Sequence, residues 1–262
     1  MGSATTQALA ASAQALAAAS GVSLDTAREL FAAARAVGES SQLSGALADP
    51  SATLAARQNV VGAVFGGFSQ NTQDIVRTAV AERWSSADDL VDGIEELAIR
   101  AAAIAEPDAD VEGELFGFSR VIAANSELEL ALGSRLGGED AKAALVERLL
   151  AGGVSAATAL IVSSLVRQPR ERRVRQLLTR AIRIVSSQRD RLVATVHTAT
   201  ALSDAQRTRL SDALSRRYGG TVTLNVVIDP AVVGGLRVQI ADDVIDGSIS
   251  ARLADLRQKL AG

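Results

Sequence analysis

Apolar positions recur with helical spacing through most of the chain and with strand spacing near its end. One predicted helix begins at Ser23 or Asp25 and carries Leu30, Phe31 and Val37 on its apolar side. The same periodicity predicts further helices at residues 4–22, 41–48, 51–65, 71–83 and 87–105. Residue types that cap helices or form turns, mainly Ser, Asp, Pro and Gly, separate these segments. We therefore expect a helical bundle in the first hundred residues.

The helical pattern begins again after residue 110. Glu29-Leu30-Phe31 recurs as Glu114-Leu115-Phe116, 85 residues later. More pairs keep this register, with one residue added before the last two: Ser41 and Ser126, Leu43 and Leu128, Leu47 and Leu132, Gly66-Gly67 and Gly152-Gly153, Ile75-Val76 and Ile161-Val162. Several identities in one register indicate a duplicated bundle rather than chance similarity among alanine-rich helices. The predicted bundles are residues 1–106 and 107–190.

Residues 191–262 change to the two-residue alternation of strands. The pattern predicts a short strand at 191–196, a helix from Ser203 to Tyr218 that ends at Gly219-Gly220, and strands at 221–228 and 236–240. In the second strand one face is expected to be buried: Val222, Leu224, Val226 and Ile228. A last helix is predicted from its apolar stripe: Ile249, Leu253, Leu256 and Leu260.

The expected fold is therefore mainly α, with two tandem N-terminal helical bundles followed by a small α+β C-terminal domain at 191–262. A chain of 262 residues is long enough for this organisation. The net charge of −3 favours neither nucleic acid nor anionic lipid as a general partner. The sequence has no cysteine, which excludes disulfides and thiolate metal sites, and it has no apolar run of 18 residues.

No set of residues has the pattern of a catalytic or metal site. His197 is the only histidine, and it lies in a predicted strand without a nearby cysteine or spaced acidic motif. The acidic residues near the end do not have the spacing of a calcium loop, and turn formation explains them more simply: Asp229, Asp242, Asp243 and Asp246. The Gly-Gly pairs lack the surroundings of a phosphate-binding loop.

An arginine-rich segment runs from Arg167 to Arg191. Its arginines are Arg170, Arg172, Arg173, Arg175, Arg180, Arg183 and Arg189. Val174, Leu177, Ala181 and Val185 belong to an apolar stripe of the same helix, so we expect the arginines on the opposite, solvated side. This face favours solvent or a protein contact. Nucleic-acid binding is the alternative, although the segment lacks interleaved aromatic residues and a known motif.

A long ordered signature near the C-terminus resembles the ATP synthase delta subunit, whose mitochondrial counterpart is the oligomycin-sensitivity-conferring protein. The signature consists of Asp229, Val232, Gly234, Gly235, Leu236, Val238, Gln239, Val244, Ile245, Asp246, Gly247, Ser248, Arg252 and Leu253. Ala241 and Ala251 stand where the family usually has Gly, and Ser250 where Arg is common. The doubled bundle resembles the long actinobacterial delta subunits, some of which are fused to a membrane-anchored b segment. The chain is then either a free delta subunit or the delta half of such a fusion.

This resemblance implies a peripheral-stalk (stator) subunit of the F-type ATP synthase that resists rotor torque. Its partners would be the N-terminal helices of the alpha subunits for the bundles and the b subunit for the C-terminal domain. The signature residues would act structurally or in the b contact. The resemblance implies no catalytic activity, cofactor, metal or nucleic acid, and a position on the cytoplasmic face of the plasma membrane that is reached only through the complex.

The two predicted copies carry opposite charges on their last helices. The first copy has Asp88, Asp89, Asp92, Glu95 and Glu96, whereas the second has the arginines described above. Since the apolar stripes match, we expect charge reversal on the outer faces of a retained fold. The resulting hypothesis is that only one copy keeps a groove for alpha-subunit helices and that the other is a spacer or a second stalk contact.

Overall fold

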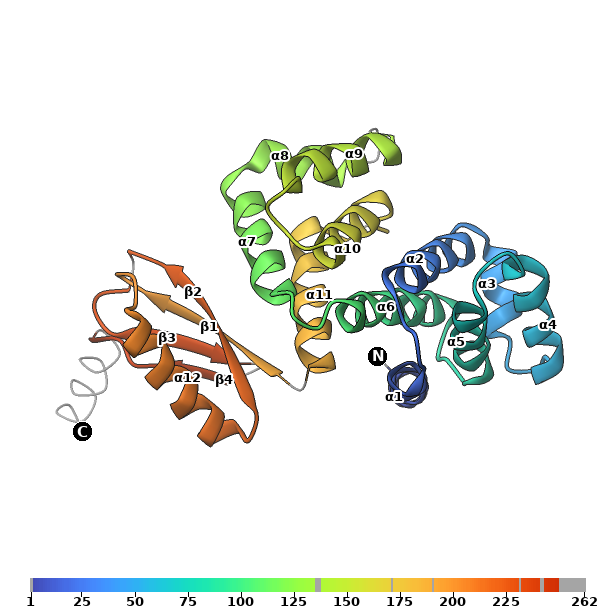
Figure 1. Ribbon diagram of the computed structural model, residues 1–262, viewed down its shortest axis with the longest axis horizontal. Helices are drawn as coiled ribbons and strands as arrows, with labels where there is room; N and C mark the ends of the chain where they lie inside the picture. Colours follow the sequence, from blue (N-terminus) through green and yellow to red (C-terminus); the bar gives the residue numbers. More distant parts are fainter. Residues whose placement is uncertain are drawn as a thin grey trace, which may run out of the picture. The chain divides into compact units, whose positions relative to one another are not determined.

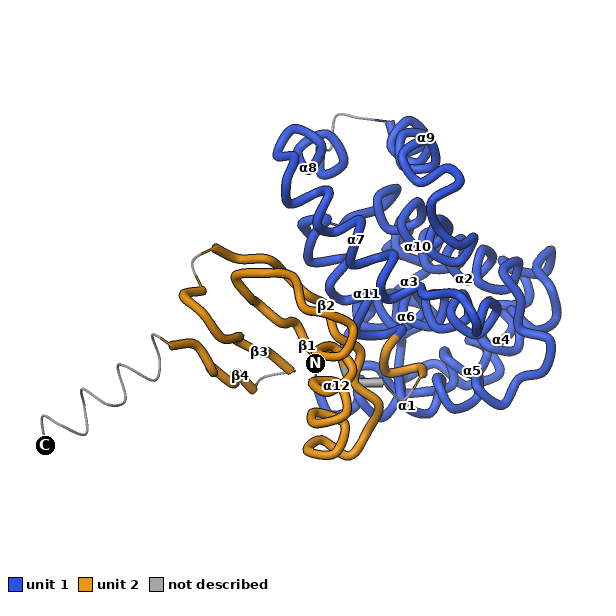
Figure 2. The backbone as a smooth tube through the Cα atoms, turned by 60° about the vertical axis from the view of Figure 1, so that its left-hand side comes forward, with its two compact units in different colours: residues 1–185 blue, residues 186–262 orange. Residues whose placement is uncertain are grey.

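The computed structural model describes residues 2–134, 138–170, 172–189, 191–230, 232–240 and 243–249. Its contacts divide the chain into two compact units, residues 1–185 and 186–262 (Figure 2). Unit 1 is helical, and unit 2 combines a small sheet with a helix (Figure 1). The predicted fold class, mainly α with a small C-terminal α+β part, is confirmed. The division of unit 1 into independent bundles at 1–106 and 107–190 stays a prediction.

The first helices of unit 1 lie close to their predicted positions. They are α1 (Ser3–Ala18), α2 (Leu24–Glu39), α3 (Ser41–Ala48), α4 (Leu54–Phe65), α5 (Gln70–Ala81) and α6 (Ala87–Ala105). Hydroxyl side chains cap five of the starts by accepting a backbone N–H: Ser23, Ser40, Thr53, Ser69 and Ser86. Helix α1 ends four residues earlier than predicted, and Gly21 then adopts a φ of 70° in the turn that leads to α2.

The second group of helices repeats the first in order and length. It comprises α7 (Val111–Ala124), α8 (Ser126–Gly133), α9 (Glu139–Leu150), α10 (Ala156–Arg167) and α11 (Val174–Gln188). Both bounds of α8 and α9 lie 85 residues after those of α3 and α4, and both bounds of α10 lie 86 residues after those of α5. This is the register that the sequence identities gave, including the added residue before α10.

Helix α6 is the central element of unit 1. Figure 1 shows it between α2, α3 and α5 on one side and the second group of helices on the other. Twelve of its nineteen residues are buried, including the two carboxylates Glu95 and Glu96. A helix that is buried on more than one side lies inside a core rather than on its surface.

Unit 2 is a four-stranded mixed sheet with one helix. The strands are β1 (Arg191–Thr198), β2 (Thr221–Ile228), β3 (Leu236–Ile240) and β4 (Asp243–Asp246), in the order β2-β1-β3-β4. Strand β1 pairs parallel with β2 through the connecting helix α12 (Asp204–Tyr218), and antiparallel with β3. Leu210, Leu214 and Tyr218 of α12 pack against the sheet core around Ala194 and Val196.

Several details of unit 2 differ from the expectation. Strand β4 was not predicted, because its four residues alternate too briefly to give a pattern. In β2, Ile228 is half exposed at the strand end, whereas Asn225 on the opposite face is buried. Strand alternation distinguishes two faces, but it does not determine how far the cover of each face extends. The predicted last helix lies outside the described residues beyond Ile249.

Candidate functional site

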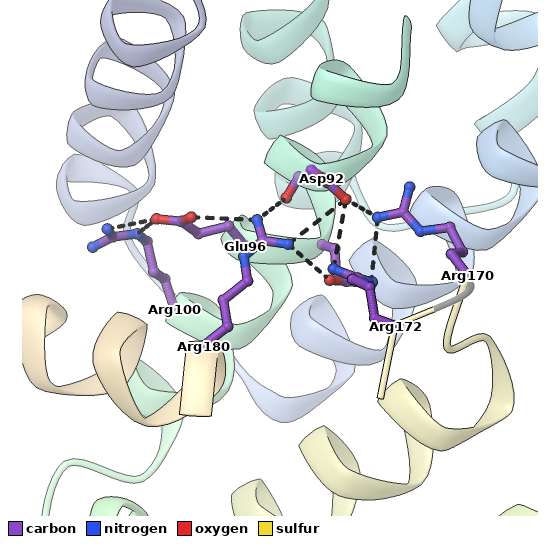
Figure 3. Close-up of polar contacts among 7 residues, drawn as sticks. Asp92, Glu96, Arg100, Arg170, Arg172 and Arg180 are labelled. Carbon is purple, nitrogen blue, oxygen red and sulfur yellow. Dashed lines mark hydrogen bonds and ion pairs between the residues drawn. The ribbon is translucent and has the colours of Figure 1, made fainter. Parts of the chain in front are cut away.

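A cluster of carboxylates and guanidinium groups joins α6 to the segment around the start of α11 (Figure 3). Arg172 Nη2 donates a hydrogen bond to Glu95 Oε2 at 2.8 Å, and Arg180 Nη1 donates to Glu95 Oε1 at 3.3 Å. Arg180 Nη2 also donates to the backbone carbonyl of Asp92 at 3.1 Å. The Asp92 carboxylate pairs with Arg170. The cluster therefore connects groups that are almost 80 or more residues apart in sequence.

The charged groups of this cluster are largely removed from water. The side chain of Glu95 is 9% exposed, and those of Arg170, Arg172 and Arg180 are 20–23% exposed. Burial lowers the pKa of Arg170 to about 10, with repulsion from Arg172 and Arg180 acting in the same direction, so it stays charged at neutral pH. Buried charges persist only when paired and hydrogen-bonded, so removing one partner leaves the others uncompensated.

The predicted solvated arginine face is wrong for three of its members. Arg170, Arg172 and Arg180 face the carboxylates of α6, whereas Arg173, Arg175 and Arg183 are exposed. The expected charge reversal on outer faces is wrong for the same reason, because the opposite charges of the two groups meet each other. Helical periodicity identified the apolar stripe of α11 correctly, but it carries no information on what lies opposite the polar side. The nucleic-acid alternative loses these three arginines to internal contacts.

A second polar contact occurs once in each group of helices. Glu29 Oε2 on α2 accepts hydrogen bonds from Ser69 N, Ser69 Oγ and Thr72 Oγ1 at 3.0, 2.6 and 2.6 Å. Glu114 Oε2 on α7 accepts the equivalent three from Ser155 and Thr158 at 3.0, 2.6 and 2.5 Å. Burial would raise the pKa of Glu29, but the bonds from Ser69 and Thr72 outweigh it, so this pKa lies below its usual value. The duplicated contact supports the register of the repeat.

The glycine pair of the C-terminal signature makes a close backbone contact. Gly234 and Gly235 have φ values of 66° and 77°, which other residues rarely adopt. A β-carbon on Gly235 would lie 2.4 Å from the carbonyl oxygen of Gly247. Gly247 N donates to Leu236 O at 2.9 Å, and Ile249 N donates to Gly234 O at 3.2 Å. The loop before β3 and the segment after β4 are therefore held together by signature residues.

The other described signature residues lie in or beside the β3–β4 hairpin. Val238 and Gln239 of β3 pair with Ile245 and Val244 of β4. After β4, Asp246 Oδ1 accepts a hydrogen bond from Ser248 N at 2.9 Å, and Ser248 holds the pKa of Asp246 below its usual value. At the other end of the signature, Asp229 N donates to Thr198 O and Val232 N to Asp229 O. Arg252, Leu253 and the departures Ala241, Ser250 and Ala251 lie outside the described residues.

Exposed aliphatic side chains gather near this signature in the sequence. Val233 is 65% exposed, and Ile228, Val244 and Ile249 are each about half exposed. Apolar side chains exposed together in one region suit a protein contact better than solvent. Sequence patterns assigned Ile228 to the buried face and gave no sign that Val244 is exposed, because the pairing of β4 at the sheet edge was not visible.

His197 and the nearby acidic residues form no catalytic arrangement. The Nδ1 atom of His197 lies 3.8 Å from Asp229 Oδ2, which is too long for a hydrogen bond. Within the described ranges, no group of three His, Cys, Asp or Glu side chains could hold a metal ion. None of the helices that the structure describes combines the length and apolar character needed to cross a bilayer.

The duplicated helical unit and the small unit with its glycine loop define a structural subunit rich in protein-contact surfaces. The chain belongs to the ATP synthase delta (OSCP) subunit family, whose model matches residues 97–260. The match begins inside α6 and covers the second group of helices and most of unit 2. The predicted family resemblance is thereby confirmed.

Relatives from actinobacteria extend the similarity over the first group of helices. The ATP synthase subunit delta of Leifsonia xyli subsp. xyli is 48% identical over 264 aligned residues that cover both chains completely. That of Nocardia farcinica is 41% identical, over 92% of this chain and 91% of its own. That of Streptomyces avermitilis is 40% identical, over 89% and 87%. The duplicated unit is thus part of the region shared with full-length relatives.

Proposed function

We propose that this protein is a non-catalytic peripheral-stalk (stator) subunit of the proton-translocating F-type ATP synthase. It links the N-terminal helices of the alpha subunits, in the catalytic head, to the b subunit of the stalk, on the cytoplasmic face of the plasma membrane. The observation that carries the proposal is the full-length similarity to proteins named ATP synthase subunit delta. Rotary catalysis requires a stator because the head would otherwise turn with the central shaft.

The two units suit two different partners. Helical bundles bind amphipathic helices by placing the apolar stripe of the partner between two of their own helices. Unit 1 supplies helices for such a contact with the alpha subunits. Unit 2 supplies the exposed aliphatic residues beside the signature, among them Val244 and Val233, for the b subunit. The signature glycines would hold these side chains in place rather than touch the partner themselves.

Co-purification of a tagged full-length chain from membranes tests the proposal, with alpha and b subunits as the readout. The variant Val244→Arg places a charge among the exposed aliphatic residues, so we expect it to lose b and to keep alpha. Thr221→Arg is the matched control, because Thr221 is exposed on a strand outside the signature. Absence of both subunits from the unaltered chain would refute the stator role. Retention of b by Val244→Arg would refute the placement of the stalk contact.

A further inference from the structure

Helix α6 takes part in both groups of helices. It contacts α2, α3 and α5 of the first group, and it contacts α10 and the arginine segment before α11 of the second. In chain order, four helices separate α1 from α6, and four helices separate α6 from α11. Helix α6 therefore stands to α7–α11 as α1 stands to α2–α6.

Contacts in the two groups support this equivalence. Helix α1 contacts α5 and α6, and helix α6 correspondingly contacts α10. Thr5 Oγ1 near the start of α1 hydrogen-bonds to Ser85 and Asp89, which lie at the turn into α6. Asp92 of α6 pairs with Arg170 and lies 3.6 Å from Arg172, at the turn into α11. The same junction is closed by hydroxyl groups in the first group and by charges in the second.

One surface that is open in the first group is filled in the second. A shallow pocket is lined by Ser3, Ala4, Gln7 and Ala8 of α1 and by Glu82 and Arg83, which follow α5. Val91 stands 87 residues after Ala4, and Gln168 stands 86 residues after Glu82. At that second place Gly38 of α2 is packed closely. A β-carbon there would lie 3.2 Å from Val91 Cγ1 and 3.8 Å from Gln168 Oε1.

We infer that the second group has its helix-docking surface occupied by α2 of the same chain, and that the free surface of this kind lies on α1 and the end of α5. The occupant we assign to that free surface is an amphipathic helix of a partner protein. Helix α2 shows what such a pair of helices accepts, namely a helix with a stripe of small and aliphatic residues such as Ala34 and Val37. The side chains on α1 are small or polar, which suits a surface exposed in the absence of its partner. This inference rests on the proposed function for the identity of the partner, the alpha subunit.

A binding experiment on the full-length chain tests the inference. A fluorescent synthetic peptide of the alpha-subunit N-terminal helix is the probe, with anisotropy for affinity and calorimetry for stoichiometry. We expect one peptide per chain. Gln7→Arg places a long charged side chain in the pocket from an exposed position, and we expect it to raise Kd by about tenfold or more. Ala17→Arg is the matched control on an exposed part of α1 outside the pocket, and we expect it to bind as the unaltered chain does.

Each outcome decides between specific statements. Two peptides per chain, or full binding by Gln7→Arg with a circular dichroism spectrum like that of the unaltered chain, would overturn the inference. If the unaltered chain fails to bind the peptide but still co-purifies with alpha subunits from membranes, the inference is wrong and the stator role stands. If it binds no peptide and co-purifies with neither alpha nor b, both are wrong.

Discussion

Replacing Glu95 with glutamine measures what the charged cluster contributes to unit 1. Glu95 accepts hydrogen bonds from Arg172 and Arg180 and is nearly buried. Breaking a buried ion pair by removing one partner costs about 3–5 kcal/mol, because the remaining charge is uncompensated. Here Asp92 and Glu96 stay 3.6 Å from Arg180 and compensate part of its charge. We therefore expect a loss of about 2–3 kcal/mol in the free energy of unfolding.

Thermal unfolding of the full-length chain, followed by circular dichroism, is the assay. In a unit of this size each kcal/mol shifts Tm by about 2–4 °C, so the expected fall is about 4–12 °C. Asp140→Asn is the matched control, because Asp140 pairs with Arg167 at 3.3 Å but its side chain is 94% exposed. An exposed pair contributes about 0–1 kcal/mol, so the control should change Tm little.

A double-mutant cycle separates the pair from its surroundings. We expect Glu95→Gln and Arg180→Gln to be non-additive by about 0.5–3 kcal/mol, as for residues that share one network. Equal small shifts in Glu95→Gln and Asp140→Asn, together with additivity in the cycle, would mean that the cluster is not a stabilising contact. The assignment of α6 to both groups of helices would then lose its polar support.

Three further substitutions test other parts of the structure. Gly235→Val should cost on the order of 1–3 kcal/mol through its positive φ and its contact with Gly247, so an unchanged urea midpoint would contradict the geometry of the loop. Gly93→Ala should lower Tm by overpacking against Trp84, at a cost of about 1–3 kcal/mol, and a neutral effect would show that the ring can move. The folded-state pKa of Glu29 is lowered, so its stabilisation is complete above the usual glutamate pKa of 4.5 and is lost as the pH falls below that value. Glu29→Gln should therefore flatten the loss of stability in acid, and an identical pH profile in urea titrations would contradict this sign.

Much of the fold could be predicted from sequence because its helices have strong local signals. Apolar spacing and N-terminal hydroxyl residues such as Ser69 and Ser86 located α5 and α6 to within a residue or two. The duplication was readable because paired identities kept one register. Strand β4 could not be predicted, since a four-residue edge strand depends on pairing with β3 rather than on its own pattern.

The candidate sites were only partly predictable. The signature could be recognised as a pattern, but the contact of Gly235 with Gly247 depends on how two separated turns meet. The arginine segment was found, yet its partners Asp92 and Glu95 lie on a helix whose polar side looks solvated in isolation. A helix sequence shows which of its sides is apolar. It does not show that its polar side faces opposite charges from elsewhere in the chain.

The burial of α6 on both sides has a consequence for how unit 1 opens. Local opening of a helix is favourable only when little apolar surface is exposed by it, as at frayed ends and surface helices. Opening α6 would expose Leu97 and Ile99 together with the charges at Glu95, whichever group of helices moved first. Its amide hydrogens should therefore exchange with solvent only when the whole unit unfolds, whereas those of α1, which buries four residues, should exchange through local opening. Unit 1 would then behave as one cooperative block despite its duplicated origin, which suits a part that must carry load without yielding in steps.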